Sequence, residues 1–198
     1  RITCSFGDLA YSRPIDLPFH SQDTMVSNNI LRGGGMVLEA VLQSALIDDD
    51  EYGTRIFSNN DCDTSCSFTP GVISGNIFDT SNAPAGRGLQ SSFYQAVETA
   101  SNTTVTGNVI KNFPNGVGPK LYECIVSNNI FYKCGNVTNG NGGIVVHNIL
   151  SGGSQDANAI ISNNLFHSTQ GGAGTTPVSD IALLGSAAYP IKGVSITG

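Results

Sequence analysis

The sequence is poor in charge and lacks tryptophan altogether. Of its 198 residues only nine are lysine or arginine, methionine occurs twice, and the net charge is −6. Nucleic-acid binding needs clustered positive charge to neutralise phosphates, whereas these nine cations are scattered along the chain. We therefore expect no nucleic-acid partner.

Long apolar runs and a cysteine framework are also missing. No run approaches the ~20 apolar residues of a membrane-spanning helix, so no membrane insertion is expected. The five cysteines, Cys4, Cys62, Cys66, Cys124 and Cys134, are odd in number and lack the paired Cys/His spacing of zinc sites. We interpret Cys62 as a small buried hydrophobic residue and predict neither a metal nor a cofactor.

An internal repeat is the main feature that the sequence does have. Seven times an apolar residue leads through one or two small polar residues into an asparagine and a further pair that is apolar in most copies, as in Val126-Ser127-Asn128-Asn129-Ile130-Phe131. An internal repeat indicates one supersecondary unit stacked on itself. The repeated asparagines, called ladder asparagines below, are Asn29, Asn60, Asn76, Asn108, Asn129, Asn148 and Asn164, spaced by 31, 16, 32, 21, 19 and 16 residues.

The repeat predicts the fold class. Each copy is short, β-branched and interrupted by Gly, Asn and Ser, which indicates strand, tight turn and strand. A spacing of 16 to 21 residues fits one turn of a parallel β-helix with three short strands, and the two long spacings contain either two coils or one coil with an inserted loop. We predict an all-β, right-handed parallel β-helix of about eight to nine coils, with residues 1–198 forming one domain.

The residue before each ladder asparagine explains how the coil turns. It is Asn, Gly or His, the types most tolerant of positive φ, so one left-handed residue would make a sharp bend between two strands. His147 is accordingly interpreted as a bend residue in preference to a catalytic base. Stacked coils lie ~4.8 Å apart, so the asparagine that follows the bend can hydrogen-bond to its copy in the next coil. The seven bend residues are Asn28, Asn59, Gly75, Gly107, Asn128, His147 and Asn163.

Alternation along the strand then assigns the two faces. If the ladder asparagines point inward, the second residue after each forms an inward apolar column: Leu31, Cys62, Phe78, Ile110, Phe131, Leu150 and Phe166. The first residue after each points outward: Ile30, Asp61, Ile77, Val109, Ile130, Ile149 and Leu165. Because six of these seven outward residues are apolar, we expect something to cover them. Either the insertions at 32–55 and 79–102 act as a lid, or three copies of the chain meet along the strip in a homotrimer.

The repeat resembles a known family. The Ser127-Asn128-Asn129-Ile130-Phe131 type of sequence, present from residue 26 to 166, is similar to the coils of pectate-lyase-like β-helices, and most of all to bacteriophage tailspike and capsular depolymerase proteins. The resemblance implies a homotrimer in a virion tail or another extracellular setting, acting on bacterial surface polysaccharide. It also implies carboxylates in hydrolases, or Lys, Arg, Tyr and His in lyases. The first residue, Arg1, and the end of the repeat at Gly198 lead us to expect a segment of a longer protein.

Candidate catalytic residues follow from glycosidase chemistry. A retaining glycosidase needs two carboxylates ~5–5.5 Å apart and an inverting one needs them ~6.5–9.5 Å apart. Asp61 and Asp63, two apart on one strand, and Glu39, about one coil earlier, form the best carboxylate set, although Asp61 and Asp63 could equally begin a solvated turn. Substrate-binding candidates come from two loops: Arg87, Tyr94, Lys120 and Tyr122.

Two functions of different classes therefore stay open. The first is a polysaccharide depolymerase that cleaves by general acid–base chemistry, with hydrolase favoured over lyase because cations are few. The second is a structural or receptor-binding spike segment that binds the same glycan without cleaving it.

Overall fold

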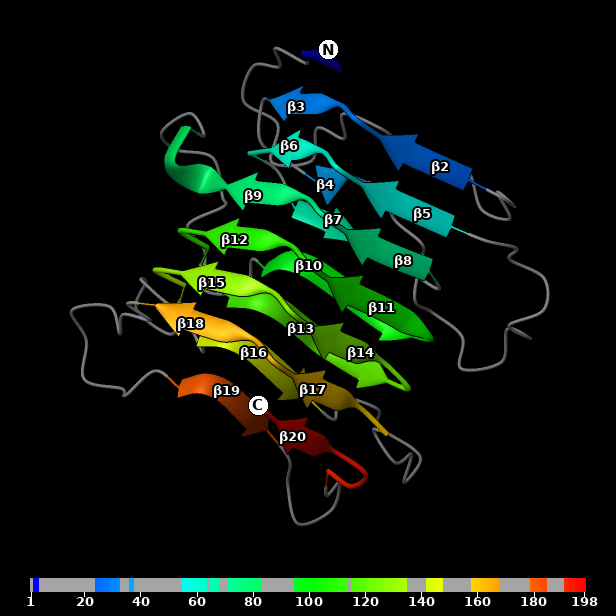
Figure 1. The fold of residues 1–198 in the computed structure, drawn as a ribbon, viewed down its shortest axis with the longest axis vertical. Coiled ribbons are helices and arrows are strands. Elements are labelled where there is room, and N and C mark those ends of the chain that lie inside the picture. Colours follow the sequence, from blue (N-terminus) through cyan, green and yellow to red (C-terminus); the bar gives the residue numbers. More distant parts are fainter. Residues whose placement is uncertain are drawn as a thin grey trace.

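The computed structural model describes residues 2–3, 24–32, 36–37, 55–63, 65–67, 71–82, 95–113, 115–134, 142–147, 158–167, 179–184 and 191–198. Within these ranges the chain is all-β, with one short 3-10 helix, η2 (Thr80–Asn82), and no α-helix. Every strand pairing is parallel, and the strands stack into three sheets along one axis (Figure 1). This arrangement is consistent with a parallel β-helix.

The three sheets, which we call A, B and C, have six or seven strands each. Sheet A contains β1 (Ile2–Thr3), β3 (Ile30–Arg32), β6 (Asp61–Cys62), β9 (Ile77–Asp79), β12 (Val109–Lys111), β15 (Ile130–Tyr132) and β18 (Leu165–His167). Sheet B contains β2 (Thr24–Ser27), β5 (Arg55–Ser58), β8 (Gly71–Ser74), β11 (Thr103–Thr106), β14 (Ile125–Ser127), β17 (Ile160–Ser162) and β20 (Ser195–Thr197). Sheet C contains β4 (Met36–Val37), β7 (Ser65–Ser67), β10 (Gln95–Ser101), β13 (Asn115–Tyr122), β16 (Gly142–His147) and β19 (Ser179–Leu184).

The chain visits the sheets in a fixed order. From β2 to β19 it passes through B, A and C six times, while β1 precedes the first pass and β20 follows the last. Sheets A and B lie side by side on one face, with sheet C behind them (Figure 1). The expected eight to nine coils are not confirmed, because the described strands form six complete passes. Strands β3 and β6 pair directly, as do β9 and β12, so each long spacing is one coil with inserted residues.

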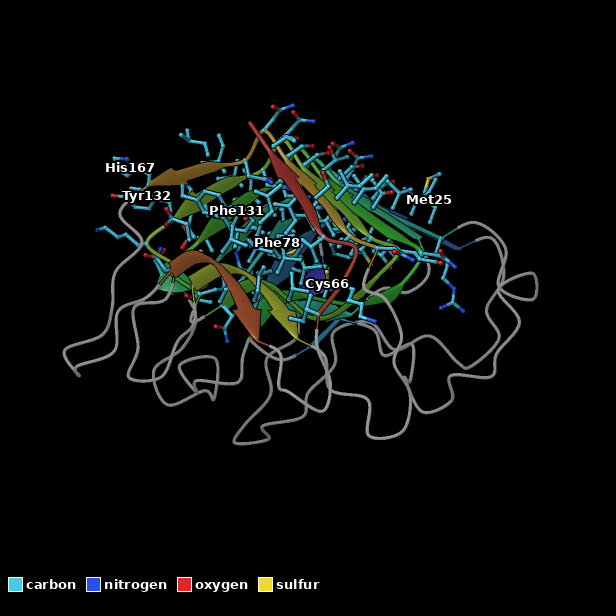
Figure 2. All side chains as sticks on the ribbon, turned by 90° about the horizontal axis from the view of Figure 1, so that it is seen from below. Met25, Cys66, Phe78, Phe131, Tyr132 and His167 are labelled. Carbon is cyan, nitrogen blue, oxygen red and sulfur yellow. The ribbon has the colours of Figure 1, made fainter. Side chains whose placement is uncertain are left out.

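The inward column is confirmed where it is described. Leu31, Cys62, Phe78, Ile110 and Phe131 are all 0% exposed, Phe166 is half-buried against the core, and Leu150 lies outside the described residues. Rings stack inside the helix as well, with centroids 6.1 Å apart for Phe57 and Phe78 and 5.0 Å apart for Phe131 and Phe166. Figure 2 shows Phe78, Phe131 and Cys66 between the three sheets, whereas Met25 points away from sheet B. The alternation predicted from the sequence therefore fixes the core.

The sharp bends between sheets B and A also match the sequence prediction. Residues with positive φ occupy the position before six of the ladder asparagines: Asn28, Asn59, Gly75, Gly107, Asn128 and Asn163. Their φ values lie between 52° and 65°, the left-handed region that Gly and Asn adopt most readily. One residue thus turns the chain from sheet B to sheet A without a loop.

A continuous ladder of asparagine side chains follows these bends inside the helix. Asn60, Asn76, Asn108 and Asn129 are at most 2% exposed. Each Nδ2 donates to the Oδ1 of the next ladder asparagine at 2.9–3.1 Å, from Asn29 through to Asn164. From Asn60 onward, Nδ2 also donates to a carbonyl of the preceding coil. The amides are therefore paired on both sides, as buried polar groups require.

The predicted coil at Asn148 is wrong. Asn129 Nδ2 donates directly to Asn164 Oδ1 at 3.0 Å, and β15 pairs with β18, so no further coil lies between them. His147 ends β16 in sheet C, where it pairs with Leu184, and is not a bend between sheets B and A. The apolar-polar-Asn pattern is short, and a strand of sheet C that ends in a polar residue matches it equally well.

Candidate functional site

The outer side of sheet A presents two columns of side chains. The first is the aliphatic strip, made of Ile30, Ile77, Val109, Ile130 and Leu165, with Asp61 between Ile30 and Ile77. The second is the polar column, made of the third residue after each ladder asparagine: Arg32, Asp63, Asp79, Lys111, Tyr132 and His167. At ~4.8 Å per coil the polar column is about 24 Å long. Figure 2 shows its last two members, Tyr132 and His167, projecting from the outer edge of sheet A.

The outer face of sheet B differs, because the column of side chains at the end of its strands contains no charged residue. Its last outward position is a hydroxyl residue in every strand, and Ser127 Oγ donates to Thr106 Oγ1 at 3.2 Å. The full column is Ser27, Ser58, Ser74, Thr106, Ser127, Ser162 and Thr197. Charged and aromatic side chains thus gather on sheet A, which makes the polar column the candidate functional site.

The first end of the polar column holds an ion pair. Arg32 Nη2 lies 2.6 Å from Asp61 Oδ2, and Arg32 Nη1 donates to the Asp61 carbonyl at 2.8 Å. The hydrogen bond that Arg32 donates to Asp61 raises the pKa of Arg32, against an opposing effect of burial, and the charges of Asp61 and Asp63 add to the rise. Asp63 itself is 2% exposed, and its backbone N–H donates to Leu31 O at 3.1 Å. Both carboxylates therefore stand beside one guanidinium group.

The middle of the polar column is a network around one carboxylate. Asn112 Nδ2 donates to Asp79 Oδ1 at 2.7 Å, and the Ser81 N–H donates to the same oxygen at 2.9 Å. Lys111 Nζ lies 4.0 Å from Asp79 Oδ2, at the outer limit of an ion pair, and Thr80 Oγ1 donates to Asn112 O at 2.6 Å. Asp79 is thus held in place by the turn, while the Lys111 side chain is 37% exposed.

The last end of the polar column is aromatic and basic. The rings of Tyr132 and His167 stack with centroids 5.2 Å apart and an interplanar angle of 7°. Lys133 Nζ lies 5.2 Å from the Tyr132 centroid, within the range of a cation–π contact, and the Lys133 N–H donates to His167 O at 3.0 Å. His167 is exposed and Tyr132 is half-buried. Two rings and an ammonium group therefore form one ordered platform at the surface.

The sequence-predicted site residues do not form one group in the described structure. Asp61 lies in β6 of sheet A, where it is ion-paired with Arg32, and Asp63 directly follows that strand and is buried. Lys120 and Tyr122 belong to β13 in sheet C, so they lie on a different sheet from the two aspartates. Glu39, Arg87 and Tyr94 lie outside the described residues.

Sequence reasoning missed most of the polar column. Arg32, Asp79, Lys111, Tyr132 and His167 were not selected, although each lies three positions after a ladder asparagine. The same alternation that identified the aliphatic strip, extended by two residues, would have found them. The third position after the ladder asparagine holds a different residue type in almost every coil, so it does not show up as a repeat.

The aliphatic strip is open to solvent in the single chain. Ile30 is 40% exposed, Ile77 42%, Ile130 41% and Leu165 59%, and Ile149 lies outside the described residues. Within the two proposed lid segments, β4 and β10 belong to sheet C, and most of the other residues of these segments lie outside the described residues. Val109, the remaining member of the strip, is half-buried.

No match helps to assign this surface. Within the described ranges, no three His, Cys, Asp or Glu residues are grouped so that they could hold a metal ion, and no helix is long and apolar enough to cross a membrane. Comparison of the chain with protein-family models, with curated proteins and with solved structures found no match.

Proposed function

We propose that this chain is a segment of a right-handed, pectate-lyase-like β-helix that binds bacterial surface polysaccharide along the polar column. We place it in a tailspike-like protein, in a virion tail or in another extracellular setting. One observation carries the proposal: the ordered, surface-exposed Tyr132–His167 stack continues into a column of hydrogen-bonding side chains about 24 Å long.

The chemistry of the polar column suits a sugar chain. Sugars combine apolar C–H faces with hydroxyl groups, so they favour sites that offer aromatic rings beside donors and acceptors. Tyr132 and His167 offer ring surface with a polar tip, and Asp79, Asn112 and Lys111 offer hydrogen-bonding groups one and two coils away. Because the residue type changes from coil to coil, successive sugar units would meet different partners.

Binding can be tested by affinity electrophoresis in gels that contain purified bacterial capsular polysaccharides. The chain should be retarded by at least one polymer, and Tyr132→Ala should weaken that retardation about tenfold, because it removes the ring that supports His167. Met25→Ala is the matched control, since Met25 is 64% exposed on sheet B and lies off the polar column. Equal weakening by both variants, or retardation by no polymer, would contradict the proposal.

Hydrolysis is a second candidate function, favoured by the pairing of Asp61 and Asp63 beside Arg32. Asp61, which is partly exposed, and Asp63, which is buried two residues later, could act as acid and base if a glycosidic bond reached both carboxylates. A reducing-end assay on the retained polymer separates cleavage from binding. If the aspartates react, Asp61→Asn should abolish the release of reducing ends, while Arg32→Gln should only reduce it. Retained polymer without reducing ends would leave the receptor-binding function.

We further propose that the aliphatic strip is buried in a parallel homotrimer. Six outward positions, five of them apolar, repeat along the helix axis, and burying each apolar side chain would contribute about 1.5–3 kcal/mol. Ile130→Asp should then convert a trimer into a folded monomer in sedimentation velocity. A monodisperse monomer for the unmutated protein would overturn the trimer.

A further inference from the structure

We infer that the last three coils of the polar column bind an anionic group on the polysaccharide, a carboxylate or a phosphate. This inference rests on the proposed function and names the substrate class within it. Its basis is the distribution of donors and charges along the column, which differs between the two ends.

The last end of the polar column offers donors and positive charge. Lys111, Tyr132, Lys133 and His167 present two ammonium groups, a phenol and an imidazole. Counting His167 as neutral, two lysines and no carboxylate give +2 at these positions. The carboxylate nearest to Lys111 is that of Asp79 at 4.0 Å, too far to neutralise the ammonium group fully. An incoming anion would therefore find unsaturated donors.

The first end of the polar column has the opposite character. Arg32 faces Asp61 and Asp63, and Asp79 follows in the next coil, so one arginine against three aspartates gives −2. The 2.6 Å contact between Arg32 and Asp61 already satisfies the strongest cation there. An acidic sugar chain should thus be repelled at this end and attracted at the other, which would fix the position of the charged units along the column.

The basic end is also ordered before any ligand arrives. The stacked rings of Tyr132 and His167 are nearly parallel. Lys133 contacts both residues, through its ammonium group the Tyr132 ring and through its N–H the carbonyl oxygen of His167. Holding these donors in place reduces the entropy that binding would otherwise cost. The net charge of −6 makes non-specific attraction of acidic polymers unfavourable, so their binding would have to come from a local site.

The experiment compares polymers that share one backbone. Acidic capsular polysaccharides are used with their carboxyl-reduced counterparts, and phosphate-containing polymers with counterparts dephosphorylated by hydrofluoric acid. Affinity electrophoresis of the unmutated chain should show at least about tenfold tighter binding to one acidic form, weakening as salt rises. The arm in which the difference occurs identifies the anion as carboxylate or phosphate.

Variants then assign the effect to residues. Lys133→Gln and Lys111→Gln should each lower affinity for the acidic polymer about fivefold more than affinity for its neutral counterpart, because only the acidic polymer loses a charge–charge attraction. Lys192→Gln removes the same charge from an exposed position just before β20 and should have no effect. Equal binding of acidic and neutral forms, or equal losses with Lys192→Gln and Lys133→Gln, would overturn the inference but not the proposed function. Binding of no polymer at all would overturn both.

Discussion

The ladder asparagines and the polar column belong to the same coils, three residues apart, yet they follow opposite rules. From coil to coil the ladder position is always asparagine, in Asn29, Asn60, Asn76, Asn108, Asn129 and Asn164. Three residues later, the same coils carry Arg32, Asp63, Asp79, Lys111, Tyr132 and His167. One position is uniform and the other is varied.

The difference comes from where each side chain finds its partners. A ladder amide is buried and must donate to the copy in the next coil and accept from the copy in the previous one, which asparagine can do because it carries both groups. Apart from the buried Asp63, the side chains of the polar column reach solvent, so water can satisfy each of them whatever its neighbour is. The repeated ladder asparagines therefore stabilise the fold, whereas the varied residues of the polar column form a surface that can differ in specificity from coil to coil.

The largest effect is expected from breaking the ladder. Asn129→Ala removes bonds to Asn164 Oδ1 and Val105 O and leaves the N–H and Nδ2 of Asn108 without their acceptor. Buried polar groups left unpaired should lower the free energy of unfolding by about 3 kcal/mol, measured by urea denaturation. The exposed neighbour is the control: Asn128→Ala should cost about 1 kcal/mol, through strain at φ 57°. A greater loss for Asn128→Ala would reverse our assignment of the two faces.

Packing between coils should rank next. A Cβ on Gly116 would lie 2.3 Å from Gly143 O and 2.6 Å from the Phe131 ring. Gly116→Ala should therefore lower the free energy of unfolding by about 2 kcal/mol, because the backbone oxygen cannot move independently of its sheet. Adding Phe131→Leu should recover only part of the loss, since the clash with Gly143 O remains. Full stability in Gly116→Ala would contradict this packing.

The interior also predicts sensitivity to alkali. Burial raises the pKa of Cys134 to about 12, and the pKa values of Cys62 and Cys66 are also raised, first of all by burial. Above about pH 9 the unfolded chain releases thiol protons that the folded chain retains, so stability present below pH 9 is lost as pH rises, by about 1.4 kcal/mol per pH unit for each thiol.

Urea midpoints measured between about pH 7 and 11 test this pH dependence. Cys134→Ala, compared with the unmutated chain at each pH, should give a shallower decline. Parallel declines in the two proteins would show that Cys134 does not contribute.

A smaller effect is expected at the bends, where Gly75 and Gly107 occupy the same position in two successive coils. A Cβ on Gly107 would meet only Gly75 N, at 3.9 Å, whereas a Cβ on Gly75 would lie 2.5 Å from Asn59 Oδ1. Asparagine tolerates the left-handed conformation and restricts the unfolded chain, so Gly107→Asn should raise the free energy of unfolding by about 0.5 kcal/mol. Gly75→Asn should instead lower it. Thermal melts of the two variants in parallel test whether contact with the preceding bend decides if the substitution raises or lowers the free energy of unfolding.

The smallest effect on stability is expected in the polar column. Lys111→Ser removes an exposed side chain whose ion-pair distance is 4.0 Å, so the free energy of unfolding should change by less than about 0.5 kcal/mol. A loss of stability comparable to that of Asn129→Ala would contradict our conclusion that the ladder asparagines stabilise the fold and the polar column does not.

Most of the buried residues of the helix could be predicted from the sequence, because the same motif occurs in six coils. The positive-φ bends, the ladder from Asn29 to Asn164 and the inward column from Leu31 to Phe166 all follow from one short motif and from the alternation of a strand. The motif was wrong at His147 and Asn148, where the five residues from Val146 to Leu150 match it without belonging to a further coil. The predicted number of coils is not confirmed, because the length of a spacing does not reveal whether it contains two coils or one coil with an inserted loop.

The candidate site was predicted only in part, since Asp61 and Asp63 were selected but their neighbours on the same surface were not. The sequence by itself determined which residues point inward, because burial demands the same chemistry in every coil. Only the tertiary structure decided that Asp79, Lys111, Tyr132 and His167, spread over 89 residues of sequence from 79 to 167, form one column on sheet A. The register of parallel strands brings them to ~4.8 Å spacing, and that register depends on hydrogen bonds between coils, which no local pattern of residues records.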